Sequence, residues 1–202
     1  MKKRYFGVML DMSRNAVMKA EEVKKFAKII SKLGYNMIQL YTEDTYEIDG
    51  EPYFGYMRGR YTKEELKDIV SYCNEIGVEV IPCIQTLAHL NCIFKWPAYD
   101  EIIDCNDILY VGQERTYELI EKMFKTMREC FTTDAIHIGM DEAHMVGLGR
   151  YLDKYGYKKR SEILIPHLKR VLEIAKKYNF KPMIWSDMFF KLANKGSYDV
   201  ID

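Results

Sequence analysis

The sequence has no excess of charge of either sign and no long apolar run. Lysine plus arginine and aspartate plus glutamate each number 30, so the formal net charge of the 202 residues is zero. A balanced chain offers no electrostatic basis for binding nucleic acid or an anionic membrane. No stretch approaches the roughly 20 apolar residues that a membrane-spanning helix needs. We therefore predict a globular protein with neither nucleic acid nor a membrane as a partner.

Cysteine is scarce, and its spacing shows no pairing. The five cysteines form no C-x-x-C pattern, and their odd number leaves at least one unpaired within the chain. Free thiols are typical of a reducing compartment. The basic N-terminus precedes an apolar run that is too short for a signal peptide and is interrupted by Asp11. We therefore expect a cytoplasmic protein.

The sequence does contain a regular alternation of short apolar segments with amphipathic ones. Strands are predicted at residues 5–10, 36–41, 78–81 and 181–185, and at the start of the stretch 134–150. Helical spacing of apolar residues predicts helices at 20–33, 62–76, 114–131 and 161–178, with a short helix at 188–194. Such a β-α alternation predicts a parallel sheet covered by helices.

The segments between these elements give weaker signals. Thr62 and Glu65 form the pattern of a capping box at a helix start. Residues 45–61 form a long loop rich in tyrosine, glycine and arginine, in which Arg58 and Arg60 either bind a ligand or are solvated. Residues 91–112 have weak periodicity, and we predict a loop with short helical turns there.

Polar residues gather directly after the predicted strands, which distinguishes two possible architectures. No G-x-G-x-x-G or phosphate-binding loop follows a strand, which argues against a nucleotide-binding open sheet. Functional groups at the carboxyl ends of strands are typical of a (β/α)8 TIM barrel. Such a barrel needs eight strands, so we predict an α/β fold of the TIM-barrel type, truncated to about its first five βα units, as one partial domain over 1–202. The residues that follow the strands are Asp11, Arg14, Glu43, Asp44, Gln85, His89, Asp141, Glu142 and Asp187.

The adjacent carboxylates Asp141 and Glu142 are the strongest chemical signal. They follow a predicted strand whose Ile136 and Ile138 form an apolar face. Neighbouring acids that are partly buried can differ in pKa, so that one is protonated while the other is ionised. The alternative is that the pair only caps a helix or faces solvent.

Four motifs in chain order resemble those of glycoside hydrolase family 20, the exo-acting β-N-acetylhexosaminidases. His137–Glu142 (HIGMDE) is similar to the family signature H-x-G-G/M-D-E. Leu10–Asn15 (LDMSRN) resembles the first-strand motif L-D-x-S-R. Gln85–Leu90 (QTLAHL) lies where the family has D-x-P-G-H, and Ile184–Phe189 (IWSDMF) where it has a tryptophan. The segments GMDEAHMVGLGRY and WSDMFFKL are similar to the small bacterial branch of the family.

The resemblance implies substrate-assisted hydrolysis of terminal β-linked N-acetylhexosamine, without a cofactor. It implies that Glu142 is the general acid and base and that Asp141 orients the 2-acetamido group. It also implies that His89, with Glu43 or Asp44 as its carboxylate, supports the acid, and that Trp185 forms a wall of the acetamido pocket. Asp11, Arg14, Asp44 and Asp187 are the further candidates for substrate binding.

The sequence departs from the family at positions that contact the sugar. Phe6 stands where the family commonly has an arginine, Gln85 replaces an acid, and Leu87-Ala88 replaces Pro-Gly. These changes leave the choice between GlcNAc and GalNAc open.

The same residues allow functions other than that of a hexosaminidase. His137, Asp141 and His144 together could hold zinc, but their spacing matches no HExxH helix, and we expect no metal. We expect His137 to make a structural hydrogen bond. A non-catalytic sugar-binding or assembly module is the main alternative, and a metal-dependent barrel hydrolase is a weaker one. An incomplete barrel is expected to have little activity and to self-associate through its open sheet edge.

Overall fold

Five parallel strands form the central sheet of the protein. The computed structural model describes residues 4–14 and 16–191. Each strand pairs in parallel with the next, in the order β1-β2-β3-β6-β7. The strands are β1 (Gly7–Asp11), β2 (Met37–Glu43), β3 (Glu79–Ile84), β6 (Ala135–His137) and β7 (Lys181–Met183). Strands that neighbour each other in sequence also neighbour each other in space, as in the predicted barrel.

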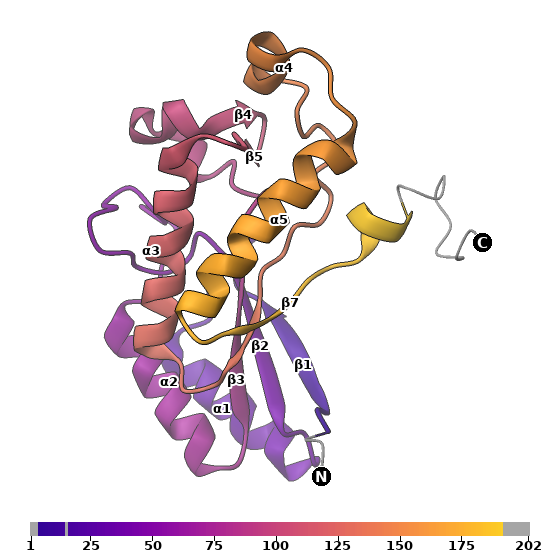
Figure 1. The fold of residues 1–202 in the computed structure, drawn as a ribbon. Helices are drawn as coiled ribbons and strands as arrows, with labels where there is room; N and C mark the ends of the chain where they lie inside the picture. Colours follow the sequence, from indigo (N-terminus) through magenta and orange to yellow (C-terminus); the bar gives the residue numbers. More distant parts are fainter. Residues whose placement is uncertain (1–3, 15, 192–202) are drawn as a thin grey trace, which may run out of the picture.

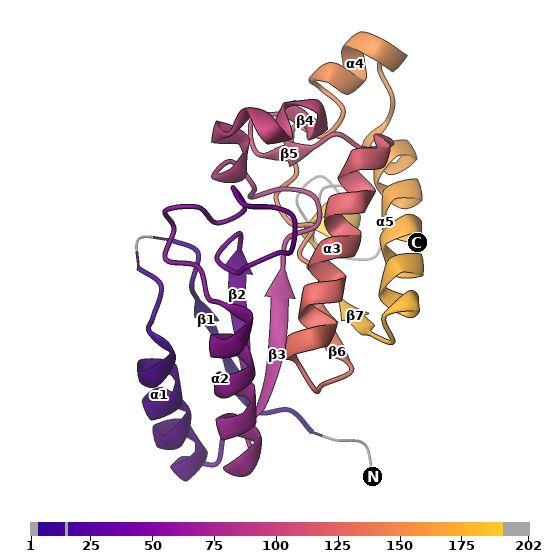
Figure 2. The ribbon, with the colours of Figure 1, turned by 90° about the vertical axis from the view of Figure 1, so that its left-hand side faces the viewer.

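The four long helices lie along the outer face of this sheet (Figures 1 and 2). Each packs beside the next in chain order, so together they form one layer. They are α1 (Ala20–Lys32), α2 (Lys63–Glu75), α3 (Glu114–Cys130) and α5 (Arg160–Lys177). The apolar stripe predicted for α1 buries Val23, Ala27 and Ile30, as the helical spacing requires. All four long helices predicted from periodicity are confirmed.

The sheet is curved, so side chains on its inner face meet across intervening strands. Gln39 on β2 and Met183 on β7 are separated by β3 and β6 in the sheet order. Nevertheless, Gln39 Nε2 lies 3.9 Å from Met183 Sδ. A flat sheet would keep strands three positions apart more than 10 Å from each other. The described residues therefore form the first part of a barrel wall.

Several short elements differ from the expectations. Residues 91–112 contain the expected helical turns, η1 (Ile93–Lys95) and η2 (Pro97–Ile102). They also contain an antiparallel hairpin, β4 (Ile103–Cys105) with β5 (Ile108–Leu109), that we did not predict. Strands of three and two residues are too short to show an alternation.

Two further differences lie near the carboxyl ends of β6 and β7. Helix α4 (Arg150–Tyr155) was not predicted, and it has no buried residue that could produce an apolar stripe. The short helix expected at 188–194 is present as the π-helix η3 (Asp187–Lys191), and residues 192–194 lie outside the described residues. None of the helices within the described ranges is long and apolar enough to cross a membrane.

The long loop after β2 is held in place by its arginines. Arg58 pairs with Asp44 and donates to the backbone carbonyl of Ser13. Arg60 donates to the carbonyls of Pro52 and Phe54 within the same loop. Both arginines are half-buried, and their charges shape the loop; whether either also contacts a ligand stays a prediction.

Candidate active site

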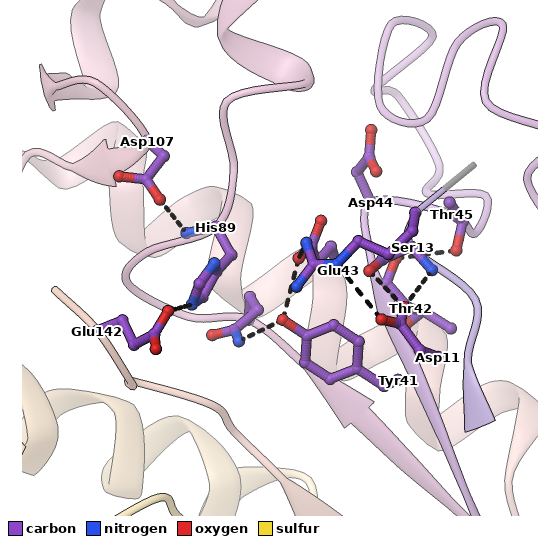
Figure 3. A network of polar contacts seen from close by, with 12 residues as sticks. Asp11, Ser13, Tyr41, Thr42, Glu43, Asp44, Thr45, His89, Asp107 and Glu142 are labelled. Carbon is purple, nitrogen blue, oxygen red and sulfur yellow. Dashed lines mark hydrogen bonds and ion pairs between the residues drawn. The ribbon is translucent and has the colours of Figure 1, made fainter. Parts of the chain in front are cut away.

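The polar residues predicted from the sequence come together at the carboxyl ends of the five strands. Parallel strands present these ends at one edge, so residues far apart in sequence converge there. Figure 3 shows residues from β1, β2 and the segments after β3 and β6 in one polar network. The described contacts of this network join Asp11, Arg14, Tyr41, Glu43, Gln85, His89, Asp107, Asp141 and Glu142.

The backbone is strained at the same place. Four non-glycine residues of the site have positive φ, namely Glu43 (44°), His89 (61°), Met140 (67°) and Glu142 (51°). Side chains with a Cβ disfavour this region, which costs about 1–2 kcal/mol per residue. Among the described residues only three other non-glycine positions share it. Strain that clusters in this way is typical of functional sites, where it orients side chains that the regular backbone could not.

His89 lies between the two adjacent carboxylates. Its Nε2 is 3.3 Å from Asp141 Oδ2 and 3.8 Å from Glu142 Oε2, and Figure 3 shows its ring directed toward Glu142. The side chain of Asp141 is 21% exposed, whereas that of Glu142 is 66% exposed. Two neighbouring acids are thus placed in different environments and share one histidine.

The charge states of Asp141 and His89 support each other. Burial alone would raise the pKa of Asp141, but the His89 ring 3.3 Å away and the hydrogen bond from Gln85 outweigh it and hold the pKa below its usual value. The adjacent Asp141 carboxylate in turn raises the pKa of His89, against the effect of burial. Asp141 is therefore an anion in the folded protein, and His89 is the cation or donor beside it.

A second part of the site links Asp141 to the first two strands. Gln85 Nε2 donates to Asp141 Oδ1 at 2.8 Å and to the Tyr41 hydroxyl at 3.0 Å. Tyr41 donates to Glu43 Oε1 at 3.0 Å, and Arg14 Nη1 donates to the same oxygen at 2.9 Å. Burial raises the pKa of Glu43, although its bonds with Tyr41 and Arg14 act in the opposite direction.

The carboxylates after β2 do not contact His89 directly. The resemblance implied that Glu43 or Asp44 serves as the carboxylate partner of His89. In the structure Glu43 binds Arg14 and Tyr41, while Asp44 pairs with Arg58 at 3.2 Å. Glu43 acts on His89 only through its charge, which raises the histidine pKa.

Asp107 is the carboxylate that holds the backbone of His89. Its Oδ2 accepts the His89 backbone N–H at 3.0 Å, as Figure 3 shows. Asp107 lies in the turn between β4 and β5, inside the segment predicted to be a loop. Nothing in the sequence indicated this residue, because that segment has only weak periodicity and the hairpin was not predicted.

Asp187 and Trp185, after β7, border the same site. Asp187 Oδ2 accepts the backbone N–H of Glu142 at 3.0 Å and so holds the strained segment that carries the acid. The Trp185 ring lies 4.7 Å from the His137 ring and is 39% exposed. His137 Nδ1 accepts the Gly139 N–H at 3.1 Å, and burial lowers the histidine pKa to about 4. His137 is thus a neutral structural residue that supports the tryptophan face.

Asp11 and Arg14 complete the edge of the site beside β1. Asp11 Oδ1 accepts the Ser13 backbone N–H at 2.9 Å, and its Oδ2 lies 3.3 Å from Arg14 Nε. The Arg14 side chain is 61% exposed, so it remains accessible to solvent while it pairs with Asp11 and Glu43.

Converging polar side chains, and no metal-binding cluster among the described residues, mark this edge. Within the described ranges, no group of three or more histidine, cysteine, aspartate or glutamate side chains is arranged to hold a metal ion. A cavity of about 560 Å³ lies elsewhere, beside α5, and its lining includes Val146, Leu164, Met188 and Phe189. We assign the site by its converging polar groups, because that cavity contains none of them.

The family comparison covers nearly the whole chain. The model of "Glycosyl hydrolase family 20, catalytic domain" matches residues 4–201. The beta-hexosaminidase of Akkermansia muciniphila is 23% identical over 167 residues, which cover 68% of this chain and 34% of that protein. Human hexosaminidase D is 22% identical over 190 residues, or 90% of this chain and 39% of that protein.

Solved structures agree in fold. A beta-N-acetylhexosaminidase crystal structure superposes with a TM-score of 0.79 at 19% identity, over 91% of this chain and 47% of that one. A mutant Streptomyces plicatus beta-hexosaminidase in complex with the product GlcNAc gives 0.77 at 23% identity, over 93% and 40%. This chain therefore spans less than half the length of these relatives, and it has the fold of the first part of their barrels.

Proposed function

The chain belongs to glycosyl hydrolase family 20, and on that premise we propose that the polar cluster is the acid–base part of a β-N-acetylhexosaminidase site. The proposed substrates are glycans or glycoconjugates that end in β-linked GlcNAc or GalNAc. The Streptomyces relative binds GlcNAc as its product, which supports this substrate class.

The observation that carries the proposal is that two adjacent acids, Asp141 and Glu142, lie in different environments beside His89. Asp141 is largely buried, accepts a hydrogen bond from Gln85 and lies beside the His89 ring, so it is suited to remain an anion. Glu142 is exposed and lies 3.8 Å from the His89 ring, so it is suited to exchange a proton with a ligand. Family-20 chemistry needs one carboxylate for each of these tasks.

In the proposed reaction the substrate supplies its own nucleophile. The carbonyl oxygen of the 2-acetamido group attacks the anomeric carbon, while Glu142 donates a proton to the departing glycosidic oxygen. Asp141 accepts the acetamido N–H and stabilises the positive charge of the resulting oxazolinium ring. Glu142 then takes a proton from water, which opens the ring at the anomeric carbon, so the sugar is released with its configuration retained.

The surrounding residues are proposed to shape the sugar site. Trp185 offers an exposed aromatic face to the acetamido methyl group. His89 holds Asp141 and lies within electrostatic reach of Glu142. Asp187 fixes the backbone of Glu142. Asp11 and Arg14, at the exposed edge, are proposed to bind sugar hydroxyls, with Glu43 and Asp44 holding the arginines around them.

We propose that the polypeptide alone has weak activity. β1 and β7 are the two edges of the described sheet, so the described residues surround a bound sugar on one side only. An open site admits water and holds the substrate loosely, and both effects reduce the rate.

The experiment that tests the function measures hydrolysis by the wild-type chain, Glu142→Gln and Asp141→Asn. The substrates are the p-nitrophenyl and dinitrophenyl β-N-acetylglucosaminides and their galactosaminide epimers. Loss of a general acid typically costs about 10²–10⁴-fold. In kcat/KM, which reports glycosidic cleavage and not the later attack of water, Glu142→Gln should lose this much on a p-nitrophenyl substrate but much less on a dinitrophenyl one, whose leaving group needs little protonation. Asp141→Asn should lose activity on both, since it acts on the acetamido group. Equal losses of kcat/KM by Glu142→Gln on both substrates would contradict the acid role.

A non-catalytic sugar-binding module is the second candidate, and the open site is the observation that favours it. Such a module would bind GlcNAc with no hydrolysis, and Glu142→Gln would leave binding intact. A metal-dependent hydrolase would lose its activity after exhaustive chelation. For this chain we expect chelation to leave hydrolysis unchanged.

A further inference from the structure

Gln85 is the residue at which the site departs from the family's acidic pattern and also the residue that connects its two halves. It follows β3 directly, and its side chain is fully buried (0% exposed). A buried amide is costly unless its polar atoms are paired. The partners of Gln85 therefore indicate what the side chain does.

The orientation of the Gln85 amide is fixed by those partners. Its oxygen accepts the Met140 backbone N–H at 3.3 Å. Its nitrogen donates to Asp141 Oδ1 at 2.8 Å and to the Tyr41 hydroxyl at 3.0 Å. An ionised carboxylate only accepts and a backbone N–H only donates, so a flipped amide would face like groups on both sides.

The surrounding backbone is shaped to admit this amide. Gly139 has φ +70°, and a Cβ built there would lie 2.5 Å from Gln85 Cδ and overlap its oxygen. The next residue, Thr86, is fully buried. Its hydroxyl donates to the Ile138 carbonyl at 2.8 Å, and its own carbonyl lies 2.9 Å from His167 Nε2. These contacts from the segment after β6 and from α5 hold the Gln85 backbone beside Asp141.

We propose that Gln85 is a positioning residue that fixes the Asp141 carboxylate and keeps it an anion, so that proton transfer falls to Glu142. A glutamate at position 85 would place a second carboxylate against Asp141, and one of the two would have to take up a proton. A neutral amide donor of the same shape stabilises the ionised form instead. The Gln85 amide thus helps to keep the two neighbouring acids of this chain in different charge states.

Tyr41 completes the arrangement on the far side. Burial raises the pKa of Tyr41, so its hydroxyl keeps its proton and donates it to Glu43 at 3.0 Å. Its lone pairs then face Gln85, which leaves the second amide hydrogen for Asp141. The titratable groups around Asp141 are Tyr41, Cys83, His89, His137 and Glu142.

The inference rests on the proposed function only for the role given to Asp141, and its test needs no turnover. The pKa of Asp141 is measured by carbon-detected NMR titration of protein labelled at the aspartate carboxyl carbons. The resonance is assigned by its disappearance in Asp141→Asn. The measurement compares the wild-type chain with Gln85→Glu, Gln85→Met and the control Gln113→Glu.

We expect Gln85→Glu to raise the pKa of Asp141 by at least about one pH unit. Gln85→Met removes one donor without adding charge and should raise it by less. Gln113→Glu makes the same chemical change at the N-cap of α3, where the side chain makes no capping hydrogen bond, and should not move it. If Gln85→Glu does not fold by circular dichroism, Gln85→Met carries the test.

An Asp141 pKa that is the same in the wild type and in every folded Gln85 variant would overturn the inference. That result is distinguishable from failure of the proposed function, which is measured by hydrolysis and sugar binding. If the Asp141 pKa shifts in the Gln85 variants but the chain binds no sugar, the positioning role of Gln85 stands and the proposed enzymatic function fails.

Discussion

At the residue scale, the site depends on backbone conformations that most residues avoid. Glu43, His89, Met140 and Glu142 have positive φ. Glu142 is the proposed acid, Met140 precedes Asp141, and His89 lies beside both carboxylates. The hydrogen bonds to Asp107, Gln85 and Asp187 hold these strained segments. Contacts with residues distant in the sequence therefore hold the strained backbone in place.

Gly139→Ala tests how much of this arrangement one residue supports. The positive φ costs about 1–2 kcal/mol for alanine, and the new Cβ would also overlap the Gln85 amide. We expect a loss of at least about 2 kcal/mol in the free energy of unfolding, measured by urea denaturation. Gly77→Ala is the matched control, since Gly77 has φ +77° with nothing within 4 Å of the added Cβ. Equal losses in the two variants would show that the Gln85 contact adds nothing.

At the element scale, the loop between β2 and α2 is ordered by buried charge. Asp44 is 1% exposed, and its Oδ1 lies 3.2 Å from Arg58 Nε. Its other oxygen, Oδ2, has no hydrogen-bond partner among the described residues. Burial raises the pKa of Asp44, while Arg58 acts to lower it. The loop and the segment after β1 are thus held together by one cation, because Arg58 also donates to the Ser13 carbonyl.

Arg58→Ala should destabilise the protein in a pH-dependent way. An unpaired buried charge typically costs about 3–5 kcal/mol, and we expect a loss near the lower end at neutral pH because Arg58 itself is partly exposed. Because the folded-state pKa of Asp44 is raised, the folded variant takes up a proton at a higher pH than the unfolded chain. Part of the lost free energy of unfolding should therefore return as the pH falls. Urea denaturation at neutral and acid pH measures both effects. Arg60→Ala is the control, because Arg60 donates to backbone carbonyls, and its loss should not depend on pH.

At the scale of the whole molecule, the curved sheet and its outer helices bring the site together and leave two strand edges. β1 and β7 each have one neighbour within the described sheet, and Met9 on β1 is 37% exposed. Unpaired strand edges favour association with other chains. Self-association through this edge stays a prediction.

Buried histidines should make the stability of the whole fold depend on pH. His167 is fully buried and contacts the Tyr117 hydroxyl and the Thr86 carbonyl. Burial, with the nearby charge of Arg170, lowers its pKa to about 4, whereas the unfolded value is about 6.5. The unfolded chain therefore binds more protons, and the contribution of this residue is fully present above about pH 6.5 and is lost as the pH falls toward about 4.

His167→Gln isolates this effect, since glutamine is a polar residue of similar length that does not titrate. Over the same pH range the wild type should lose on the order of 3 kcal/mol more than the variant in free energy of unfolding. The comparison cancels the buried acids Glu43 and Asp44, whose raised pKa values act in the opposite direction. Parallel pH profiles for the two proteins would contradict the assignment.

Much of the architecture could be predicted because it depends on local periodicity. The apolar stripe of α1 and the capping box of Thr62 and Glu65 are patterns within a few residues of each other, and both are present as expected. The hairpin β4–β5 and helix α4 were missed because the first is too short for a pattern and the second buries no side chain. Periodicity reports burial, so elements that bury little give no signal.

The sequence by itself determined the strand–helix alternation, the family motifs and the placement of Asp141, Glu142 and His89 after strand ends. Only the tertiary structure decided which groups are partners. It pairs Glu43 with Arg14, 29 residues away, and Gln85 with Asp141, 56 residues away. The reason is that hydrogen bonds depend on distances of a few tenths of an ångström. Those distances follow from strand register and from backbone turns such as Gly139, and no spacing in the sequence records them.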